Sequence, residues 1–416
     1  MTQSAEFRRH PNDRAAIHTL DVDLRRPFFH RACAATFAIW FICLALTAVA
    51  SEPQQPRQPG MRPLGVTVQE DGTVPFTIAS DRDRGWSAWW MFRLEDLQPG
   101  QTLRLQPRGR AQARAQLPVI SEDDGRSWRH FDIRHPVTVN SRQAIFAWYV
   151  PYLLAHAETF AARQDELGER LRVRELCRSE QDRPVHLFEI GAPLTAGKPV
   201  IWVQARQHAW EVGSSWTAQG LMDWAVGDSP EAAELRSMAT LLVVPLMDVD
   251  NVELGNGGKD QKPYDHNQGW TLEEPVWTSV RAAQAELRAL VERRQLVLFF
   301  DLHDPGWGGP FEWWIGSLED LAPDIRQRTQ ALADTFRQES ATSIPFKGFK
   351  IVGEKGRNSR IWVARTTQRS VVGGTLEIGI APPRDFTEPP PAQHLLLGAA
   401  LGRSVVRWMN AQGGQR

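Results

Sequence analysis

The stretch PVIWVQARQHAWE, residues 199–211, decides the fold class of this chain. Its first seven residues are mostly apolar, as expected of a buried strand, and polar residues follow at once. The same texture returns in LVLFFDLH (296–303) and VVGGTLEIG (371–379), with helix-length segments between the strands. Strands that alternate with helices predict an α/β fold, in which a mostly parallel mixed sheet has helices on both faces.

The other elements of this α/β region are expected on either side of these strands. The stretch 144–171 predicts one strand followed by a helix, and TLLVVPL (240–246) predicts a further strand. The hydrophobic pattern predicts helices at 214–225, 276–294, 320–337 and 393–409.

Upstream of this region the hydrophobic period changes to two. Short alternating runs between Gly65 and about Gln143 are separated by Asp-Gly and Pro-Gly turns. This pattern is typical of an antiparallel β-sandwich. We therefore expect a small β-sandwich domain at 63–150, followed by the α/β domain at 151–416.

The first fifty residues read as a targeting segment. Six arginines between residues 8 and 31 precede the apolar run AATFAIWFICLALTAVA, which ends in Ala48-Val49-Ala50. A basic flank, a short apolar core and small residues at its end predict a signal peptide at 1–50 and export to the periplasm. An uncleaved inner-membrane anchor is the alternative, because the run approaches spanning length. The Pro/Gln-rich residues 51–62 read as a linker.

The composition limits the possible partners. The 416 residues carry 48 Lys+Arg and 49 Asp+Glu, so no global charge favours nucleic acid or an anionic membrane. A membrane contact is expected only through the possible N-terminal anchor, and the oligomeric state is left open. Three cysteines are too few and too scattered for a disulfide framework or a cysteine zinc site. A bound metal would therefore need histidine and carboxylate ligands.

Three predicted strand ends carry polar residues, and ligands of open α/β sheets bind beyond such ends. The first is followed by His208 and Glu211, an H-x-x-E pair that lets an imidazole and a carboxylate converge on one cation. The second delivers His303, and the third places Glu377 in an otherwise apolar strand. Each has a structural alternative: a chance H-x-x-E match, a hydrogen-bonded core histidine, or a carboxylate paired with a nearby cation.

Taken together, the three strand ends indicate a catalytic zinc site. Two histidines and one glutamate form the ligand set of a zinc ion that keeps one position for water, and Glu377 remains as a base for that water. Asp301 either orients a metal-binding histidine or caps a local turn.

The order of these motifs resembles the zinc carboxypeptidases of the M14 type. The H-x-x-E pair is followed by PLMDVDN (245–251), GNGGK (255–259), DHNQGW (265–270), Asp301-Leu-His303 and Thr375-Leu-Glu377. WWMFRLEDLQPG (89–100) and FAWYVPYLLAHAE (146–158) resemble the N-terminal domain of the cytosolic-carboxypeptidase branch of that family.

The resemblance implies roles for these residues. His208, Glu211 and His303 would hold Zn²⁺, and Glu377 would act as general base and then as proton donor to the leaving amine. Asn267 and the residue after it would bind the terminal carboxylate of a peptide substrate. The oxyanion would be met by a cation, for which Lys259 is the nearest candidate in the glycine-rich loop.

The chain departs from the family pattern at two of these places. The family places an arginine in the glycine-rich loop, whereas Lys259 offers only a point charge. The family also has an Asn-Arg pair where this chain has Asn267-Gln268. A free carboxyl terminus of a substrate should therefore be bound poorly unless another arginine takes the place of the missing one.

Basic residues between Glu354 and Arg369 could supply that substitute. Arg360 and Arg365 are the preferred candidates for binding an acidic side chain or a displaced carboxylate, and a solvated basic face is the alternative. The 17 tryptophans include Trp307, Trp313 and Trp314, which could wall the cleft. Trp86, Trp89, Trp90 and Trp148 are expected mainly in core or interdomain packing rather than in glycan binding.

These observations predict an exported zinc metallocarboxypeptidase that hydrolyses a peptide amide near a carboxylate-bearing terminus. One alternative is an amidase or carboxypeptidase of the same fold that acts on cell-wall peptide. The other is a non-catalytic binding protein of the same fold. The presence of Glu377 argues against it, because a protein without catalysis needs no general base.

Overall fold

The computed structural model describes residues 58–78, 83–109, 118–306, 308–379 and 390–413. All of them belong to one compact unit that spans Gln55–Arg416. The predicted signal peptide or anchor at 1–50 lies outside the described residues, as does Trp307. No helix in the described ranges is both long enough and apolar enough to cross a membrane.

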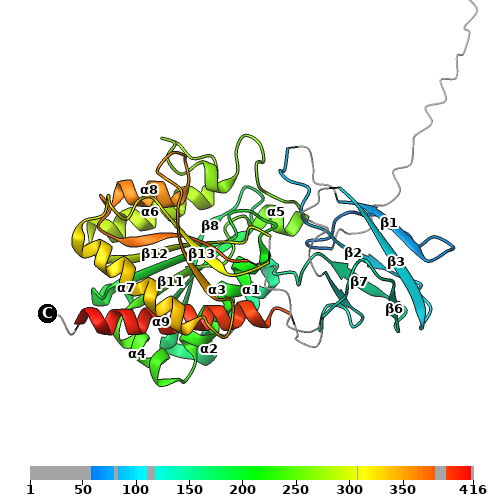
Figure 1. The fold of residues 1–416 in the computed structure, drawn as a ribbon, viewed down its shortest axis with the longest axis horizontal. Coiled ribbons are helices and arrows are strands. Elements are labelled where there is room, and N and C mark those ends of the chain that lie inside the picture. The colour runs from blue at the N-terminus through cyan, green and yellow to red at the C-terminus, as the bar shows by residue number, and fades with distance from the viewer. Residues whose placement is uncertain (1–57, 79–82, 110–117, 307, 380–389, 414–416) are drawn as a thin grey trace, which may run out of the picture. The chain divides into compact units, whose positions relative to one another are not determined.

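A mixed sheet of eight strands forms the centre of the larger region (Figure 1). The strands around β10 and β12 pair in parallel, whereas β9, at one side, and β13, at the other, introduce antiparallel pairs. The predicted α/β fold with a mostly parallel mixed sheet is therefore confirmed. In spatial order the strands are β14 (Phe346–Ile351), β13 (Phe311–Ile315), β15 (Val372–Glu377), β12 (Leu296–His303), β10 (Val200–Ala205), β11 (Thr240–Val244), β9 (Pro184–Gly191) and β8 (Leu171–Arg178).

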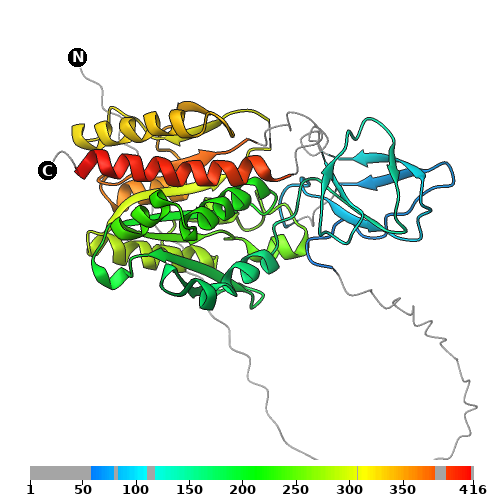
Figure 2. The same cartoon turned by 90° about the horizontal axis from the view of Figure 1, so that it is seen from below.

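Helices cover both faces of this sheet, because its central strands are apolar on both sides. In β10, Ile201 and Val203 belong to one buried cluster with residues of α3, α4, α7 and α9, whereas Trp202 belongs to another with residues of α5, α6 and α8. Figure 2 shows α9, in red, running alongside α7, and α9 contacts both α7 and α3. The helices are α1 (Leu154–Ala161), α2 (Gln164–Leu167), α3 (Val212–Val226), α4 (Pro230–Met238), α5 (Val249–Leu254), α6 (Thr278–Glu292), α7 (Pro323–Glu339), α8 (Ser359–Thr366) and α9 (Ala392–Gly413).

Two smaller sheets precede this region. One contains β1 (Thr73–Thr77), β3 (Gln101–Arg108) and β6 (Val137–Val139), and the other β2 (Met91–Leu94), β7 (Ala144–Ala147), β4 (Val119–Ser121) and β5 (Arg129–His130). Phe76 of the first sheet packs against Trp90 and Phe92 at centroid distances of 5.0 and 4.8 Å, which is the face-to-face packing of a sandwich.

The small sheets depart from the expected antiparallel pattern in one pair. β1 runs parallel to β3, with Thr73 opposite Arg104, because the chain between the two strands passes through the other sheet at β2. The last residues of the predicted linker are folded, since Arg62 pairs with Met91 by two backbone hydrogen bonds of 2.7 and 2.8 Å and Met61 is buried. The domain boundary at residue 150 stays a prediction.

Candidate metal centre and active site

The turn after β10 brings His208 and Glu211 to one point. Arg206 adopts a φ of 66°, which is the left-handed region, and its Nε donates to the Ala209 carbonyl at 2.7 Å. Glu211 N donates to His208 O at 3.1 Å, and α3 begins at the next residue. The spacing of three therefore produces convergence, as the sequence predicted.

Arg206 braces this turn from inside the protein. Its guanidinium is buried and donates to Ser215 Oγ at 3.2 Å and to the Tyr152 carbonyl at 3.4 Å. Burial lowers the pKa of Arg206 to about 9 although acidic neighbours oppose the shift. The sequence alone gives no sign of this role for Arg206, because nothing in RQHAWE (206–211) indicates which residue folds back on the turn.

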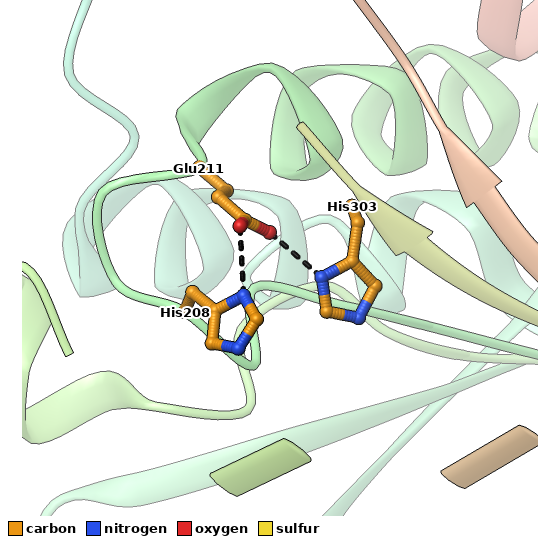
Figure 3. Close-up of side chains that lie close together, drawn as sticks. All are labelled: His208, Glu211 and His303. Carbon is orange, nitrogen blue, oxygen red and sulfur yellow. Dashed lines mark hydrogen bonds and ion pairs between the residues drawn. The ribbon is translucent and has the colours of Figure 1, made fainter. Parts of the chain in front are cut away.

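His303 joins the pair from the end of β12 (Figure 3). His208 Nδ1 lies 2.7 Å from Glu211 Oε1, and His303 Nδ1 lies 2.8 Å from Glu211 Oε2. One ligand atom of each of the three residues lies within 4.8 Å of the others. All three side chains are buried, so the cluster was assembled by the fold and not by chance proximity on a surface.

A second set of carboxylates faces the other nitrogen of each imidazole. His303 Nε2 lies 3.1 Å from Asp301 Oδ2, and His208 Nε2 lies 3.6 Å from Asp265 Oδ2, which is an ion-pair distance longer than a hydrogen bond. These contacts fix which nitrogen of each ring faces Glu211. Of the two alternatives for Asp301, the structure favours the one in which it orients a histidine.

Asp301 is itself held by three neighbours. Gln207 Nε2 donates to it at 2.6 Å, Gln204 Nε2 at 3.4 Å, and Ser359 Oγ also donates to its carboxylate. Gln207 in turn accepts from Trp270 Nε1 at 2.6 Å. Residues of β10, β12 and α8 thus share one buried network beneath the cluster, and only Asp301 among its polar members stood out in the sequence.

The charge of the cluster fits a bound cation. A neutral imidazole has one N–H, yet each ring here faces carboxylates with both nitrogens, so one contact per ring needs a second proton or a metal ion. Burial alone would lower the pKa of both histidines. The neighbouring carboxylates outweigh this effect, so the pKa of His208 is raised and the pKa of His303 is raised well above the usual range. Two imidazole nitrogens and one carboxylate are donors that suit Zn²⁺.

Glu377 lies beside this cluster at the end of β15. It is paired with His303 across the parallel β12–β15 ladder, and Ile378 N donates to His303 O at 2.8 Å. Burial raises the pKa of Glu377 to about 7, against the opposing effect of His303 and Lys259. A carboxyl group that titrates near neutrality can both accept and donate a proton, which is the property of a general acid–base residue.

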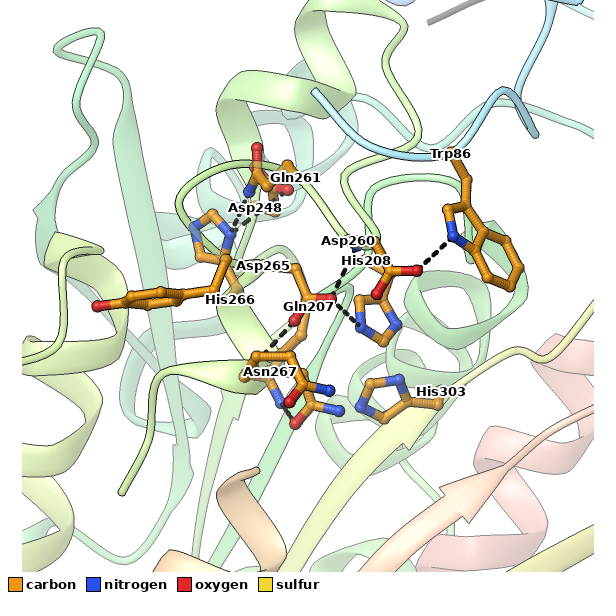
Figure 4. Close-up of polar contacts among 12 residues, drawn as sticks. Trp86, Gln207, His208, Asp248, Asp260, Gln261, Asp265, His266, Asn267 and His303 are labelled. Atoms are coloured by element: carbon orange, nitrogen blue, oxygen red, sulfur yellow. Dashed lines mark hydrogen bonds and ion pairs between the residues drawn. The ribbon is translucent and has the colours of Figure 1, made fainter. Parts of the chain in front are cut away.

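The loop between α5 and α6 carries three further predicted site residues, Lys259, Asn267 and Gln268. Lys259 is half-buried and acts electrostatically on His208, Asp265 and Glu377. Asn267 Oδ1 accepts from Gln207 Nε2 at 3.3 Å and from Ser359 N at 3.5 Å. Gln268 is half-buried, and its backbone N–H donates to Asp265 at 2.9 Å. Figure 4 shows Asn267 beside Gln207.

The two candidate arginines lie in different surroundings. Arg360 is 7% exposed and lines a cavity of about 50 Å³ together with Glu354 and Gly373. Arg365 is exposed in the last turn of α8, and no hydrogen bond or ion pair joins it to the described site residues. A wider pocket of about 960 Å³, bordered by Arg170, Arg172 and Arg236, contains none of the predicted site residues.

The tryptophans near the site are mainly core residues. Trp313 is fully buried in β13, whereas Trp314 is half-buried. Trp89, Trp90 and Trp148 are buried as expected, and Trp86 is half-buried.

Residues 157–302 match the family model of the zinc carboxypeptidases. Curated relatives are cytosolic carboxypeptidase 3 of Mus musculus, 28% identical over 38% of this chain and 16% of the relative, and cytosolic carboxypeptidase 2 of Danio rerio, 27% identical over 49% and 30%. The chain therefore matches less than a third of the length of either relative.

Solved structures share the fold over most of the chain. A metallo-carboxypeptidase from Burkholderia cenocepacia superposes with a TM-score of 0.71 at 19% identity, covering 86% of this chain and 98% of the other. A metallo-carboxypeptidase from Pseudomonas aeruginosa, in complex with (2-guanidinoethylmercapto)succinic acid, gives 0.67 at 20% identity, covering 85% and 98%. At these identities the likeness establishes the fold.

Proposed function

We propose that this chain, whose residues 157–302 belong to the zinc carboxypeptidase family, is a zinc-dependent carboxypeptidase that hydrolyses a peptide bond next to a carboxylate-bearing end of its substrate. The observation that carries the proposal is the convergence of His208, Glu211 and His303 within 4.8 Å, beside Glu377. The family match covers part of the chain, so the activity of the whole protein rests on this geometry.

His208, Glu211 and His303 would bind the metal, and the carboxylates of Asp301 and Asp265 would orient the two histidines. Bound zinc supplies a Lewis acid and a water of lowered pKa. Asp301 and Asp265 keep each imidazole turned with Nδ1 toward Glu211, so the donor atoms are arranged before the ion arrives.

Glu377 would move the proton. It takes a proton from the attacking water and gives it to the nitrogen of the leaving amine, which its raised pKa permits near neutral pH. Lys259 would stabilise the negative charge that develops on the former carbonyl oxygen, acting as a point charge. Asn267 would offer its amide to the substrate, with its carbonyl oxygen already held by Gln207 and Ser359.

Arg360 would bind an acidic group of the substrate. Glu354 in the same cavity forms an ion pair with Arg369, whose Nε donates to it at 3.0 Å, and it also acts electrostatically on Arg360. Burial lowers the pKa of Arg360, and the nearby Glu354 carboxylate opposes this shift.

The replacement of the family's arginine by Gln268 favours a second candidate function within the same chemistry. A substrate whose carboxylate is displaced or absent would not need that arginine, as in an amidase or carboxypeptidase that acts on cell-wall peptide. This candidate also requires export, which we propose from the N-terminal sequence; N-terminal sequencing of the protein from cells tests whether the segment through Ala50 is removed.

The experiment that tests the proposal compares one peptide with a free and with an amidated carboxyl terminus, using the wild-type protein and Glu377→Gln. Zinc-dependent release of the terminal residue from the free peptide supports a carboxypeptidase, and preference for the amidated peptide supports the second candidate. Glu377→Gln should retain zinc and lose at least about a hundredfold in kcat, since general acid–base catalysis contributes that much or more. Zinc binding without hydrolysis of either peptide would indicate a binding protein instead.

A further inference from the structure

A segment of the N-terminal β-region runs along the loop that carries Lys259. Gly258 N donates to Arg84 O at 3.0 Å, Trp86 N donates to Lys259 O at 2.9 Å, and Lys262 N donates to Asp83 O at 2.9 Å. The two stretches of backbone are therefore paired on both sides of Lys259, although they lie more than 170 positions apart in the chain.

Glycines allow this close approach. A Cβ added to Gly257 would lie 1.9 Å from Trp86 O, and one added to Gly85 would lie 2.2 Å from Lys259 O. Backbone atoms cannot yield at such distances, so the contact requires glycine on both stretches. The sequence GNGGK thus serves a packing contact with residues 83–86 in addition to any role at the site.

The Trp86 indole contacts the side chains of Lys259 and Asp260, and Figure 4 shows its contact with Asp260. Lys259 Nζ lies 5.4 Å from the centroid of the Trp86 ring, which is a cation–π distance. Trp86 Nε1 donates to Asp260 Oδ2 at 2.5 Å, so the neighbouring carboxylate is engaged by the indole. No ion pair between Lys259 and Asp260 is found in the described part of the chain.

The same indole reaches the metal-binding turn. Its centroid lies 6.1 Å from that of Trp210, which stands between His208 and Glu211 in sequence. Trp210 N donates to Gly257 O at 3.1 Å, so the glycine-rich loop lies between the turn and residues 83–86. Trp86 is positioned to fix the ammonium of Lys259 relative to the candidate metal ligands.

We infer that Trp86 is a positioning residue that acts through Lys259, and that the N-terminal β-region completes the active site in this way. This inference rests on the proposed role of Lys259 as the donor to the oxyanion. A lysine has a flexible four-carbon stem and loses rotamer entropy when it is held in one geometry. The aromatic face attracts the ammonium and restricts its position before substrate binds.

The first test measures the reactivity of Lys259 without reference to activity. Trp86→Leu is compared with Trp128→Leu, a matched control at another half-buried tryptophan of the N-terminal β-region, by mass-spectrometric rates of lysine acetylation with acetic anhydride. We expect acetylation of Lys259 to accelerate several-fold in Trp86→Leu alone. Equal rates in the two variants and the wild type would overturn the inference, whether or not the protein hydrolyses peptides.

The second test is a double-mutant cycle in kcat, with the zinc content of every variant measured. We expect Trp86→Leu to lower kcat about five- to tenfold with little change in KM, Trp86→Phe to restore most of it, and Trp86→Leu to have less than a twofold effect in the Lys259→Ala background. An equal loss in both backgrounds would show that Trp86 acts elsewhere and would overturn the inference. A wild-type protein that does not hydrolyse peptides contradicts the proposed function, and the acetylation rates then decide the inference alone.

Discussion

Gln268 is the residue at which the site departs most from the pattern it resembles. It occupies the position of an arginine that would grip the terminal carboxylate, and its own backbone is anchored by Asp265 at 2.9 Å. The backbone of the loop is therefore held in place at Gln268, and at this position only the side chain differs from the arginine of the family pattern. A single substitution can restore the cation without rebuilding the loop.

Gln268→Arg should raise kcat/KM on peptides with a free carboxyl terminus. A charge-assisted, bidentate contact contributes about 1.5–3 kcal/mol, which corresponds to a gain of about tenfold or more, chiefly in KM. The measurement is the ratio of kcat/KM for free and amidated forms of one peptide. An unchanged ratio would show that another cation already binds the carboxylate. Besides Arg360 and Arg365, Arg357 is a candidate, since its carbonyl accepts from Trp270 N at 2.8 Å beside this loop.

Arg360→Gln should reduce any preference for substrates with a terminal Glu or Asp. The guanidinium is buried in the cavity beneath β15, so its loss removes a charge that an acidic side chain could meet there. We expect a fall of about tenfold in the kcat/KM ratio of acidic to neutral terminal residues, as for one charge-assisted hydrogen bond. Arg365→Gln is the matched control, because Arg365 is exposed on the same helix. A similar change in both variants would argue against the assignment.

At the scale of residues, the sequence predicts the polar residues at the ends of strands. It does not predict contacts that form only when the chain has folded. His208, Glu211, His303 and Glu377 were identifiable because polar groups at the ends of apolar strands need partners. The contacts of Arg206 were not, since they depend on a left-handed turn. For Trp86 the sequence indicated core or interdomain packing but not the contact with Lys259, which joins residues more than 170 positions apart.

At the scale of elements, the packing of α9 against α3 supports the turn that carries His208 and Glu211, because α3 begins directly after Glu211. A Cβ added to Gly398 in α9 would lie 2.2 Å from Thr217 O and 2.4 Å from Leu221 N in α3. The two helices therefore approach too closely for any side chain at this position.

Gly398→Ala should force α3 and α9 apart. Overpacking of this kind typically lowers the free energy of unfolding by about 1–3 kcal/mol. Urea unfolding measures the change, with Leu396→Ala as control, because Leu396 is 51% exposed on the same helix and should alter stability by less than about 0.5 kcal/mol. Equal stability of Gly398→Ala and the wild type would contradict the close helix crossing.

His394 near the start of α9 makes stability depend on pH. Its Nδ1 lies 3.2 Å from the Tyr149 hydroxyl, and burial lowers its pKa from 6.5 to about 3. Between pH 3 and pH 6.5 the unfolded chain binds a proton at His394 more readily than the folded chain does. The stability that comes from keeping His394 neutral is therefore fully present above pH 6.5 and is lost as the pH falls toward 3.

The pH effect of His394 is measured by urea unfolding at pH 7 and pH 5. The wild type should lose about 2 kcal/mol more between these two values than His394→Phe, which is less stable at pH 7 but cannot titrate there. His135→Phe, at a histidine whose side chain is 75% exposed, should behave as the wild type. Equal losses in the wild type and His394→Phe would contradict the buried, neutral state of His394.

The prediction of elements succeeded where the hydrophobic pattern was long and uniform. The strands that became β10, β11, β12 and β15 were expected close to their observed bounds, as were the four helices α3, α6, α7 and α9. The hairpin of β8 and β9 was missed, because β8 lies at a sheet edge and its alternating arginines resemble a charged helix face. The edge strand β14 was missed for the same reason, since FKGFKI interrupts its apolar residues with lysines and a glycine.

At the scale of the whole molecule, the N-terminal β-region and the α/β region belong to one compact unit. The change of hydrophobic period predicted two regions correctly but carried no information about how they meet. That contact depends on glycines and backbone pairing between residues 83–86 and 257–262, which no local pattern encodes. The predicted signal peptide or anchor, and the periplasmic location, stay predictions.

The central claim is that four residues from three strand ends form one zinc-dependent site, and metal analysis tests it most directly. The purified protein, dialysed against zinc and then against metal-free buffer, is measured by elemental mass spectrometry alongside His303→Ala. We expect about one zinc per chain in the wild type, less than a tenth of that in the variant, and hydrolysis that chelation abolishes and added zinc restores. A wild-type protein that retains no zinc, or a His303→Ala variant that retains as much as the wild type, would contradict the account.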